Sequence, residues 1–235
     1  PLKSSFPVTS GESLTSFEVA LKLRFAYLEQ FFEGDYFRYS LGTKYPVVEL
    51  MVTKGIPGVF NSAYSYTKLS ATVKAFMKIS PLGTLSYKVY AGQIFGTLPF
   101  TYLEIHPGND LFYYNKSTFN LMNRFEYVSD KYAGFNVEHN IGSGIFRFTP
   151  LTRKLKWRQF WNVKTLWGSI NTENKKVNNS TGFKFLNGGN YTEIGTGIDN
   201  IFRVFRVDFV WKLAPPSDIS HYSRFGIFGS FQFQF

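Results

Sequence analysis

Hydrophobic and polar residues alternate along many stretches of the chain, most clearly in the last twelve residues. Phe225, Ile227, Phe231, Phe233 and Phe235 share one parity, and the other parity carries mostly Arg, Gly, Ser and Gln. This period of two predicts a strand with one apolar and one polar face. Such a terminal strand would aggregate through an open edge. A closed barrel in lipid would seal it, and an inner strand of a soluble sandwich is the alternative.

The same alternation recurs about ten times, and no run of apolar residues is long enough for a helical membrane span. We therefore expect an all-β protein, an antiparallel transmembrane β-barrel of about ten strands that closes alone or belongs to a larger barrel. Residues 1–235 are expected to form one barrel domain, the C-terminal portion of a longer protein. The predicted strands cover 16–29, 46–55, 64–80, 84–95, 119–128, 132–141, 159–170, 191–201, 202–213 and 224–235.

The number of strands assigns each connection to one side of the membrane. With a periplasmic C-terminus, the connections 30–45, 171–190 and 214–223 are expected outside. The connections 97–118 and 142–156 are then expected on the periplasmic side. Both are long, although periplasmic turns of such barrels are normally short.

Composition favours a barrel and argues against several other classes. The chain holds 27 Phe and 15 Tyr, and 20% of its residues are aromatic. Polar residues separate these aromatic residues over short distances along the sequence. It has no cysteine, which removes disulfide frameworks and thiolate metal sites. A net charge of +10 raises nucleic acid as a partner. The basic residues are spread over nearly every strand without a nucleic-acid motif, so we expect no nucleic acid partner.

Charges on the polar faces of the predicted strands would point into the lumen of a barrel. They either tune a channel for anions, or pair across neighbouring strands and fill the barrel. Acids and bases alternate along the last strands, which favours the second interpretation. The expected lumen-facing residues are Lys22, Arg24, Lys68, Lys74, Lys88, Arg124, Glu126, Glu138, Arg206 and Asp208.

The two long connections contain a candidate partner or plug segment. The aromatic side chains of 97–118 would be costly to leave in water, at about 25 cal/mol per Å². They either fold back on the barrel rim as an interface girdle, or they plug the lumen or dock a periplasmic domain or partner. Basic residues of the other connection supply a rim that also suits anionic lipid headgroups. The candidate residues are Phe100, Tyr102, Glu104, His106, Asp110, Arg153, Lys154 and Lys156.

The three histidines are the main candidates for chemistry. His106 lies near two acidic residues and suggests a metal or acid–base cluster, but capping of a structured turn is favoured. His139 lacks a convincing nucleophile and acid for a triad. His221 with Asp218 is a weak candidate for a protease site. We therefore expect no enzyme, no catalytic residue, no metal site and no cofactor.

Several phrases resemble a known family. SLGTKYPVVELMVTKG, IFGTLPFTYLEIHPGND, FNLMNRFEYVSDKY and PLTRKLKWR look like the C-terminal barrel of a Bacteroidota outer membrane family of unsettled function, whose full-length members carry an N-terminal carboxypeptidase-regulatory-like domain. More remotely, the ending resembles the BamA-like surface antigen superfamily, with Gly195, Gly197, Arg206, Asp208 and Phe235 in the matching places. The Arg-Gly-Tyr tripeptide of that superfamily does not occur in this sequence.

The pattern and the resemblance together imply a protein of the bacterial outer membrane. The expected function is a structural or assembly/translocation-type role, exercised with a periplasmic domain or partner. A passive diffusion channel with a basic lumen is the alternative. The expected partners are outer membrane lipid, a periplasmic or outer membrane protein, and the outer membrane assembly machinery. That machinery would recognise Phe231, Phe233 and Phe235 as a C-terminal signal.

Overall fold

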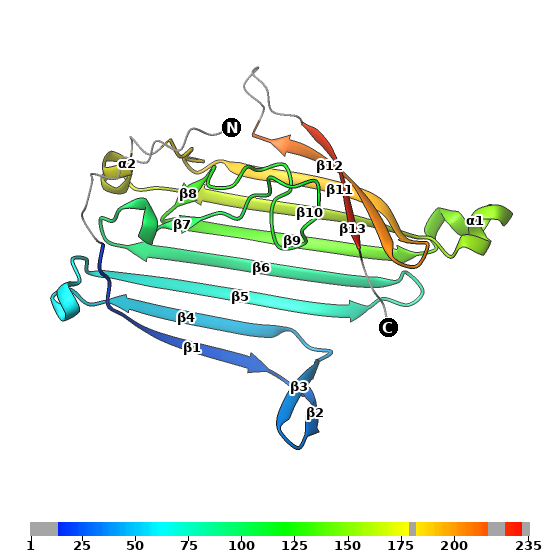
Figure 1. Ribbon diagram of the computed structural model, residues 1–235, viewed down its shortest axis with the longest axis horizontal. Helices are drawn as coiled ribbons and strands as arrows, with labels where there is room; N and C mark the ends of the chain where they lie inside the picture. Colours follow the sequence, from blue (N-terminus) through cyan, green and yellow to red (C-terminus); the bar gives the residue numbers. More distant parts are fainter. Residues whose placement is uncertain (1–13, 179–181, 216–223, 232–235) are drawn as a thin grey trace.

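One large antiparallel sheet dominates the computed structural model, which describes residues 14–178, 182–215 and 224–231 (Figure 1). Its nine strands lie in the order β1-β4-β5-β6-β9-β10-β11-β12-β13, and the all-β prediction is confirmed. The strands are β1 (Glu18–Ala26), β4 (Val47–Gly55), β5 (Tyr66–Lys78), β6 (Thr84–Phe95), β9 (Lys131–Gly142), β10 (Arg158–Ser169), β11 (Asn190–Ile201), β12 (Phe205–Ala214) and β13 (Phe225–Phe231).

The remaining elements are short and lie in the connections. None of the helices in the described ranges is long and apolar enough to cross a membrane. The short strands form two small two-stranded sheets, β2 with β3 and β7 with β8. These elements are β2 (Gln30–Gly34), β3 (Phe37–Gly42), η1 (Val59–Asn61), η2 (Phe100–Tyr102), β7 (Glu104–Ile105), β8 (Val128–Ser129), η3 (Gly144–Phe148), α1 (Pro150–Leu155) and α2 (Thr172–Asn178).

The sheet has an outer face and an inner face. Residues 96–130, here called the inner segment, lie across the inner face, in front of β9 and β10 in Figure 1. The strands β12 and β13 turn over the same face. In the described residues, β1 and β13 are the two edges of the sheet.

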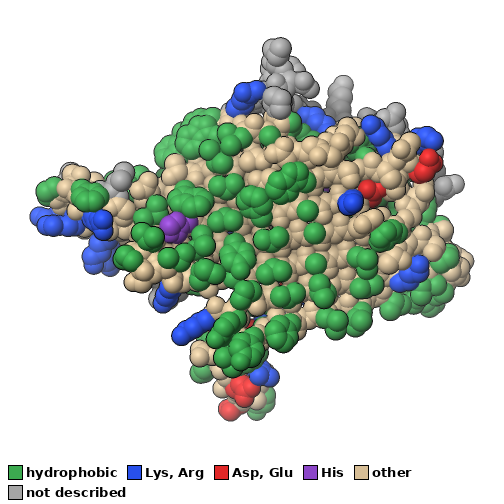
Figure 2. Space-filling model, turned by 180° about the vertical axis from the view of Figure 1, so that it is seen from behind, with side chains coloured by type: hydrophobic (Ala, Val, Ile, Leu, Met, Phe, Trp, Pro, Cys, Tyr) green, Lys and Arg blue, Asp and Glu red, His purple; other side chains and the backbone are tan. Residues whose placement is uncertain are grey.

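The outer face carries apolar side chains because every second residue of each strand points to it. Figure 2 shows this face, with hydrophobic side chains spread over the middle of the sheet and charged ones mostly at its margins. Large hydrophobic side chains are exposed there from the first strand to the last: Val19, Leu21, Leu23, Phe25, Leu50, Val52, Leu69, Val89, Trp161, Trp167, Phe205, Trp211, Phe225, Ile227 and Phe231.

The predicted strand at 119–128 is wrong. This part of the inner segment crosses the inner face of the sheet, and only its last residue enters a strand, β8. The backbone N–H groups of Asn120 and Leu121 donate to the carboxylate of Glu193 (2.8 and 2.7 Å), not to a neighbouring strand. Phe119 is buried against the sheet. The alternation of apolar and polar residues in 119–128 therefore reflects contacts of an irregular segment with the sheet.

Loss of that strand changes the ends at which the connections lie. Residues 97–118 and 171–190 were expected at opposite ends of the strands, but they meet at the same end. The backbone N–H of Leu98 donates to the side-chain oxygen of Asn174 (2.7 Å), and the side-chain amide of Asn178 donates to the Leu98 carbonyl (2.9 Å). The predicted topology for 97–118 is therefore incorrect, because one strand too many was counted after it.

The predicted end of the sheet is also wrong for the first long connection, and for the same reason. Residues 30–45, expected at the end of 171–190, form the hairpin of β2 and β3 at the opposite end of the sheet (Figure 1). Residues 142–156 lie at the end opposite 171–190, as expected, and contain η3 and α1. The connection 214–223 lies mostly outside the described residues.

Tyrosine rings on the inner face lean over glycines of the neighbouring strand. Tyr90 of β6 faces Gly134 of β9, and Tyr132 of β9 faces Gly92 of β6. A Cβ added at Gly134 would lie 2.6 Å from the Tyr90 ring and 2.6 Å from the carbonyl oxygen of Thr165. These glycines therefore make room for the rings on which the inner segment packs.

We expect Gly134→Val to destabilise the protein by about 1–3 kcal/mol, because its side chain collides with Tyr90 and the β10 backbone. The measurement is the free energy of unfolding in urea. Ala133→Val, on the exposed neighbouring position of the same strand, is the matched control. Equal losses in the two variants would contradict the proposed packing.

Candidate functional site

The inner segment packs on the sheet through an apolar contact at one end. Leu98, Tyr102 and Leu103 are buried there in one cluster with Tyr66 of β5 and Phe183. This cluster lies at the end where the connection 170–189 leaves the sheet. It therefore closes that end of the inner face with hydrophobic side chains.

Glu193 holds the middle of the inner segment. Its side chain is 1% exposed, and besides the backbone N–H groups of Asn120 and Leu121 it accepts a hydrogen bond from the Tyr191 hydroxyl (2.9 Å). A buried carboxylate is costly unless hydrogen bonds replace its water. The three donors provide that replacement, and two of them belong to the backbone of the inner segment.

Lys164 makes the complementary contact from β10. Its ammonium donates to the backbone carbonyls of Asn115 (3.0 Å) and Thr118 (2.6 Å), and it lies 4.7 Å from the centre of the Tyr114 ring. The residue is buried. A cation of the sheet thus binds carbonyls of the inner segment, while an anion of the sheet binds its N–H groups.

Arg206 is the largest charged side chain that is fully enclosed. Its guanidinium forms two hydrogen bonds with Asp208 (2.9 and 2.7 Å) and one with Glu138 of β9 (2.8 Å). The ring of Phe160 lies 3.6 Å below it, and the ring of Tyr114 lies 4.8 Å away. Two carboxylates and two aromatic faces therefore surround one cation that is itself almost fully buried.

The inner segment also covers part of the free edge of the sheet. Tyr113 forms a parallel bridge with Gly229 of β13. The backbone N–H of Tyr114 donates to the Gly229 carbonyl (3.0 Å), and the Gly229 N–H donates to the Phe112 carbonyl (3.1 Å). The last strand thus has β12 on one side and a short piece of the inner segment on the other.

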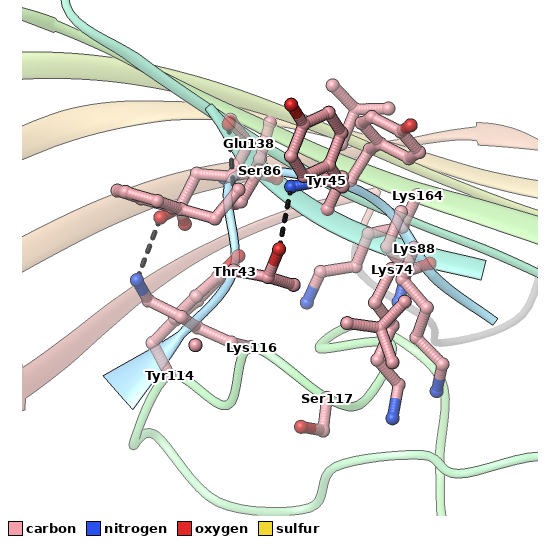
Figure 3. Close-up of a pocket in the computed structure, with 18 residues that line it drawn as sticks. Thr43, Tyr45, Lys74, Ser86, Lys88, Tyr114, Lys116, Ser117, Glu138 and Lys164 are labelled. Atoms are coloured by element: carbon pink, nitrogen blue, oxygen red, sulfur yellow. Dashed lines mark hydrogen bonds and ion pairs between the residues drawn. The ribbon is translucent and has the colours of Figure 1, made fainter. Parts of the chain in front are cut away.

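A cavity of about 400 Å³ lies between the inner segment and β5, β6, β9 and β10 (Figure 3). In the described residues, its charged lining consists of four lysines and one carboxylate, Glu138. Lys74, Lys88 and Lys164 gather on one side in Figure 3, and Lys116 lies on the other, bonded to Glu138 at 2.8 Å. The site is therefore strongly basic.

Two further cavities adjoin it along the inner face. One of about 280 Å³ shares Lys88, Ser117 and Asn136 with it and reaches His106. The other, of about 580 Å³, shares four lining residues with it and continues toward Arg158. Together the three cavities follow the inner face from Glu104 and His106 to Arg158 and Asp199.

Most residues predicted to face a lumen share the inner face. The strand register connects them, since Arg24 pairs with Glu49, Glu49 with Thr72, and so on across the sheet. The residues placed there are Lys22, Arg24, Lys68, Lys74, Lys88, Glu138, Arg206 and Asp208. The prediction is wrong for Arg124 and Glu126, because they belong to the inner segment and not to a strand of the large sheet.

Acidic and basic side chains of this face pair in part, as expected from their alternation. Glu49 binds Lys74 at 3.2 Å and also lies 3.7 Å from Lys22. Within the described residues, Lys88 forms no ion pair, and its ammonium lies 5.1 Å from the Tyr90 ring. The charges are therefore not fully compensated near the cavity.

The candidate plug residues separate into two groups. Phe100, Tyr102, Glu104 and His106 of the inner segment pack on the sheet and are buried or half-buried. Asp110 is exposed, and its carboxylate accepts a hydrogen bond from the backbone N–H of Arg124 (3.1 Å). The first four residues therefore lie over the inner face of the sheet. A position on the rim alone would not have placed them there.

The basic residues assigned to the same site lie elsewhere. Arg153 and Lys154 are in α1 and Lys156 follows it, at the end of the sheet opposite the apolar cluster. They cannot form one site with Tyr102. At the C-terminus, Phe231 is exposed in β13, and Phe233 and Phe235 lie outside the described residues.

The residues that sequence reasoning missed are Lys164 as a ligand of backbone carbonyls and Glu193 as a ligand of backbone N–H groups. Alternation within 158–169 puts Lys164 on the same face as Asn162 and Leu166, so its inward direction was available from the pattern. No sequence signal identified its partners. Alternation within 190–201 likewise puts Glu193 on the same face as Tyr191.

His106 is a buried packing residue. Its Nε2 forms a hydrogen bond with the Ser129 hydroxyl (3.0 Å), and its ring meets that of Tyr132 edge to face. Burial lowers the pKa of His106 to about 4. Ser129 is fully buried and does not line the adjoining cavity, so this pair offers no accessible nucleophile.

Acidic side chains do not gather around His106 to form a metal site. In the described ranges, no group of three or more His, Asp or Glu side chains is arranged to hold a metal ion. His139 lies beside Trp161, whose ring N–H donates to it (3.1 Å). His221 lies outside the described residues.

The geometry defines an all-β protein whose curled antiparallel sheet encloses a segment of its own chain. Residues 1–176 match the family of unknown function (DUF5686) C-terminal domain. Because this match covers more than half of the 235 residues, the chain belongs to that family. No curated protein matches the sequence. The expectation of a C-terminal domain from an uncharacterised family is thus confirmed.

We expect Asp208→Asn to lower the free energy of unfolding by about 3–5 kcal/mol, because it removes one charge from a buried ion pair and leaves Arg206 undercompensated. The exposed pair of Glu33 and Arg38 offers the control, and Glu33→Gln should change stability by less than about 1 kcal/mol. Urea unfolding of both variants measures the difference. A loss in Asp208→Asn no larger than in the control would contradict the buried network.

Acidification should weaken the packing of His106. The unfolded chain binds a proton at this residue near pH 6.5, whereas the folded chain binds it only near pH 4. Its contribution is therefore complete above the unfolded pKa and is lost as pH falls, by roughly 2 kcal/mol between about pH 7 and about pH 5. Urea unfolding at both pH values should show this loss, and His106→Gln should remove that part of it. An unchanged pH dependence in the variant would refute this assignment.

Proposed function

We propose that this chain forms the membrane-embedded barrel of a bacterial outer membrane protein, and that its inner segment plugs the barrel. The outer face supports this proposal, because its hydrophobic side chains are exposed along strands from β1 to β13. A soluble protein rarely leaves so large an apolar surface in water. Lipid acyl chains would cover it, while polar groups stay on the inner face.

Closure of the barrel is part of the same proposal. In the described residues, β1 pairs with β4 alone, and β13 pairs with β12 and, at Gly229, with the inner segment. Most backbone groups along these two edges would then be unpaired, which is not tolerated in lipid. Either these two strands pair with one another in the membrane, or further strands lie between them. The inner-face side chains of β1, such as Lys22 and Arg24, are partly exposed, as expected for a strand that lacks one neighbour.

The role that the geometry supports best is a structural or assembly/translocation-type one, exercised with a periplasmic domain or a protein partner. The observation that carries it is the packing of the inner segment, which seals one end of the inner face with a cluster around Leu98, Tyr102 and Phe183. A sealed lumen suits a scaffold or a gated machine better than a pore. We further propose that the domain has no catalytic activity of its own.

A passive diffusion channel remains the second candidate, favoured by one observation. Three adjoining cavities follow the inner face, and the one of about 400 Å³ has a strongly basic lining. They would form an anion-selective path only if the inner segment moved away from the apolar cluster. The two candidates therefore differ in whether the resting protein conducts ions.

Conductance in planar bilayers separates the two candidates. We expect the purified protein to insert and to conduct almost no ions, because the inner segment fills the lumen. Replacement of residues 97–129 by a short Gly-Ser linker should open an anion-selective pore, since it removes Leu98 and Tyr102 of the apolar cluster together with the carbonyl and N–H partners of Lys164 and Glu193. A matched control replaces residues 33–38 of the β2–β3 hairpin in the same way and should stay closed.

An open anion-selective pore in the unmodified protein would favour the diffusion channel and overturn the plugged barrel. Recovery of the protein in a soluble fraction, and not in outer membranes, would contradict both candidates. In that case the apolar outer face would need a protein cover instead of lipid.

A further inference from the structure

The basic cavity of Figure 3 has more cations than its own carboxylate can balance. Lys74 of β5 and Lys88 of β6 lie directly opposite one another on the same face. Like charges in this position destabilise a sheet. Glu138 is already engaged by Lys116 and Arg206, and Glu49 by Lys74. In the described residues Lys88 therefore has no carboxylate partner of its own, and it faces another lysine beside the cavity.

Polar groups of the same cavity also lack partners. Within the described residues, the Tyr114 hydroxyl and the side-chain amide nitrogen of Asn162 are buried and form no hydrogen bond. Both residues line the cavity, and they are 3% and 2% exposed. An unpaired buried donor costs about 1–3 kcal/mol. These two donors are explained if they meet an acceptor in the cavity.

We propose that this cavity binds a phosphate group, carried by a small hydroxylated molecule or by a lipid headgroup. Lys74 and Lys88 would supply the charge, and Tyr114 and Asn162 would donate hydrogen bonds to phosphate oxygens. Lysine binds phosphate as a point charge and needs no fixed fork geometry. The volume of about 400 Å³ suits a small molecule.

One further atom indicates that the ligand also carries a hydroxyl group. Asn136 lines the cavity, and its side-chain oxygen is buried and has no hydrogen-bond partner in the described residues. The phosphate group of a monoester dianion has no proton to offer it, whereas a hydroxyl on the same molecule donates one. Hydroxyl groups of Thr43, Ser86 and Ser117 add contacts that suit a polar ligand.

Calorimetric titration of the full chain in neutral detergent tests the site. The probes are glycerol 3-phosphate, inorganic phosphate and acetate, and we expect them to bind in that order of decreasing affinity. Lys74→Gln/Lys88→Gln should weaken binding of glycerol 3-phosphate at least tenfold, since two charges are lost. Lys54→Gln/Lys175→Gln removes two charges elsewhere, on the outer face and in α2, and should bind like the unmodified chain.

A lipid arm distinguishes the two sources of the phosphate. The chain is placed in nanodiscs of phosphatidylcholine with or without phosphatidylglycerol, and glycerol 3-phosphate is titrated again. Competition by phosphatidylglycerol assigns the site to a lipid headgroup, and its absence assigns it to a soluble phosphate. Either result supports a phosphate site.

Thermal stability gives a readout that does not depend on detecting a weak ligand. Glycerol 3-phosphate should stabilise the unmodified chain, and Lys88→Glu should stabilise the chain without ligand, because the introduced carboxylate would face Lys74 across the strands. The same variant should lose the response to glycerol 3-phosphate. No binding and no stabilisation in the unmodified chain, or equal binding by Lys74→Gln/Lys88→Gln, would overturn the proposal. Conductance is measured separately. A plugged barrel that lacks the phosphate site can therefore be told apart from a phosphate-binding protein that is not a plugged barrel.

Discussion

Buried charges on the inner face need partners, and the backbone of the inner segment supplies many of them. Glu193 accepts two of its N–H groups, and Lys164 donates to two of its carbonyls. Each ion alone would cost several kcal/mol in a dry interior. The segment alone would leave its own peptide groups unpaired, because it forms little regular secondary structure. The sheet and the segment therefore give each other the hydrogen bonds that water would otherwise supply. These hydrogen bonds explain how an irregular segment is held on the sheet.

The inner segment also divides the inner face into two regions of opposite character. At one end, Leu98 and Tyr102 seal the sheet with apolar side chains. Further along the strands lies a space lined by lysines, where Lys74 faces Lys88. A continuous polar lumen would not need the first region, and a simple hydrophobic core would exclude the second. This division favours a closed domain that retains a binding space.

Nine strands of the large sheet and the direction of their side chains could be predicted, because a period of two is local information. The failure at 119–128 has the same origin, since Phe119, Leu121, Phe125 and Tyr127 alternate mostly with polar residues without pairing as a strand. The partners of Glu193 and Lys164 could not be predicted. They are backbone atoms 73 and 46 residues away, and peptide groups carry no sequence signature. The wrong strand count also hid the separation of α1 from the apolar cluster.

The bridge between Tyr113 and Gly229 has a consequence for the order of folding. The inner segment comes before β9 in the chain, yet it binds β11 through Glu193 and β13 through Gly229. It cannot be fixed until those later strands have formed. Contacts of such long sequence separation form slowly, because the chain must first lose the entropy of closing large loops. Docking of the segment is therefore a late step that follows assembly of the C-terminal strands.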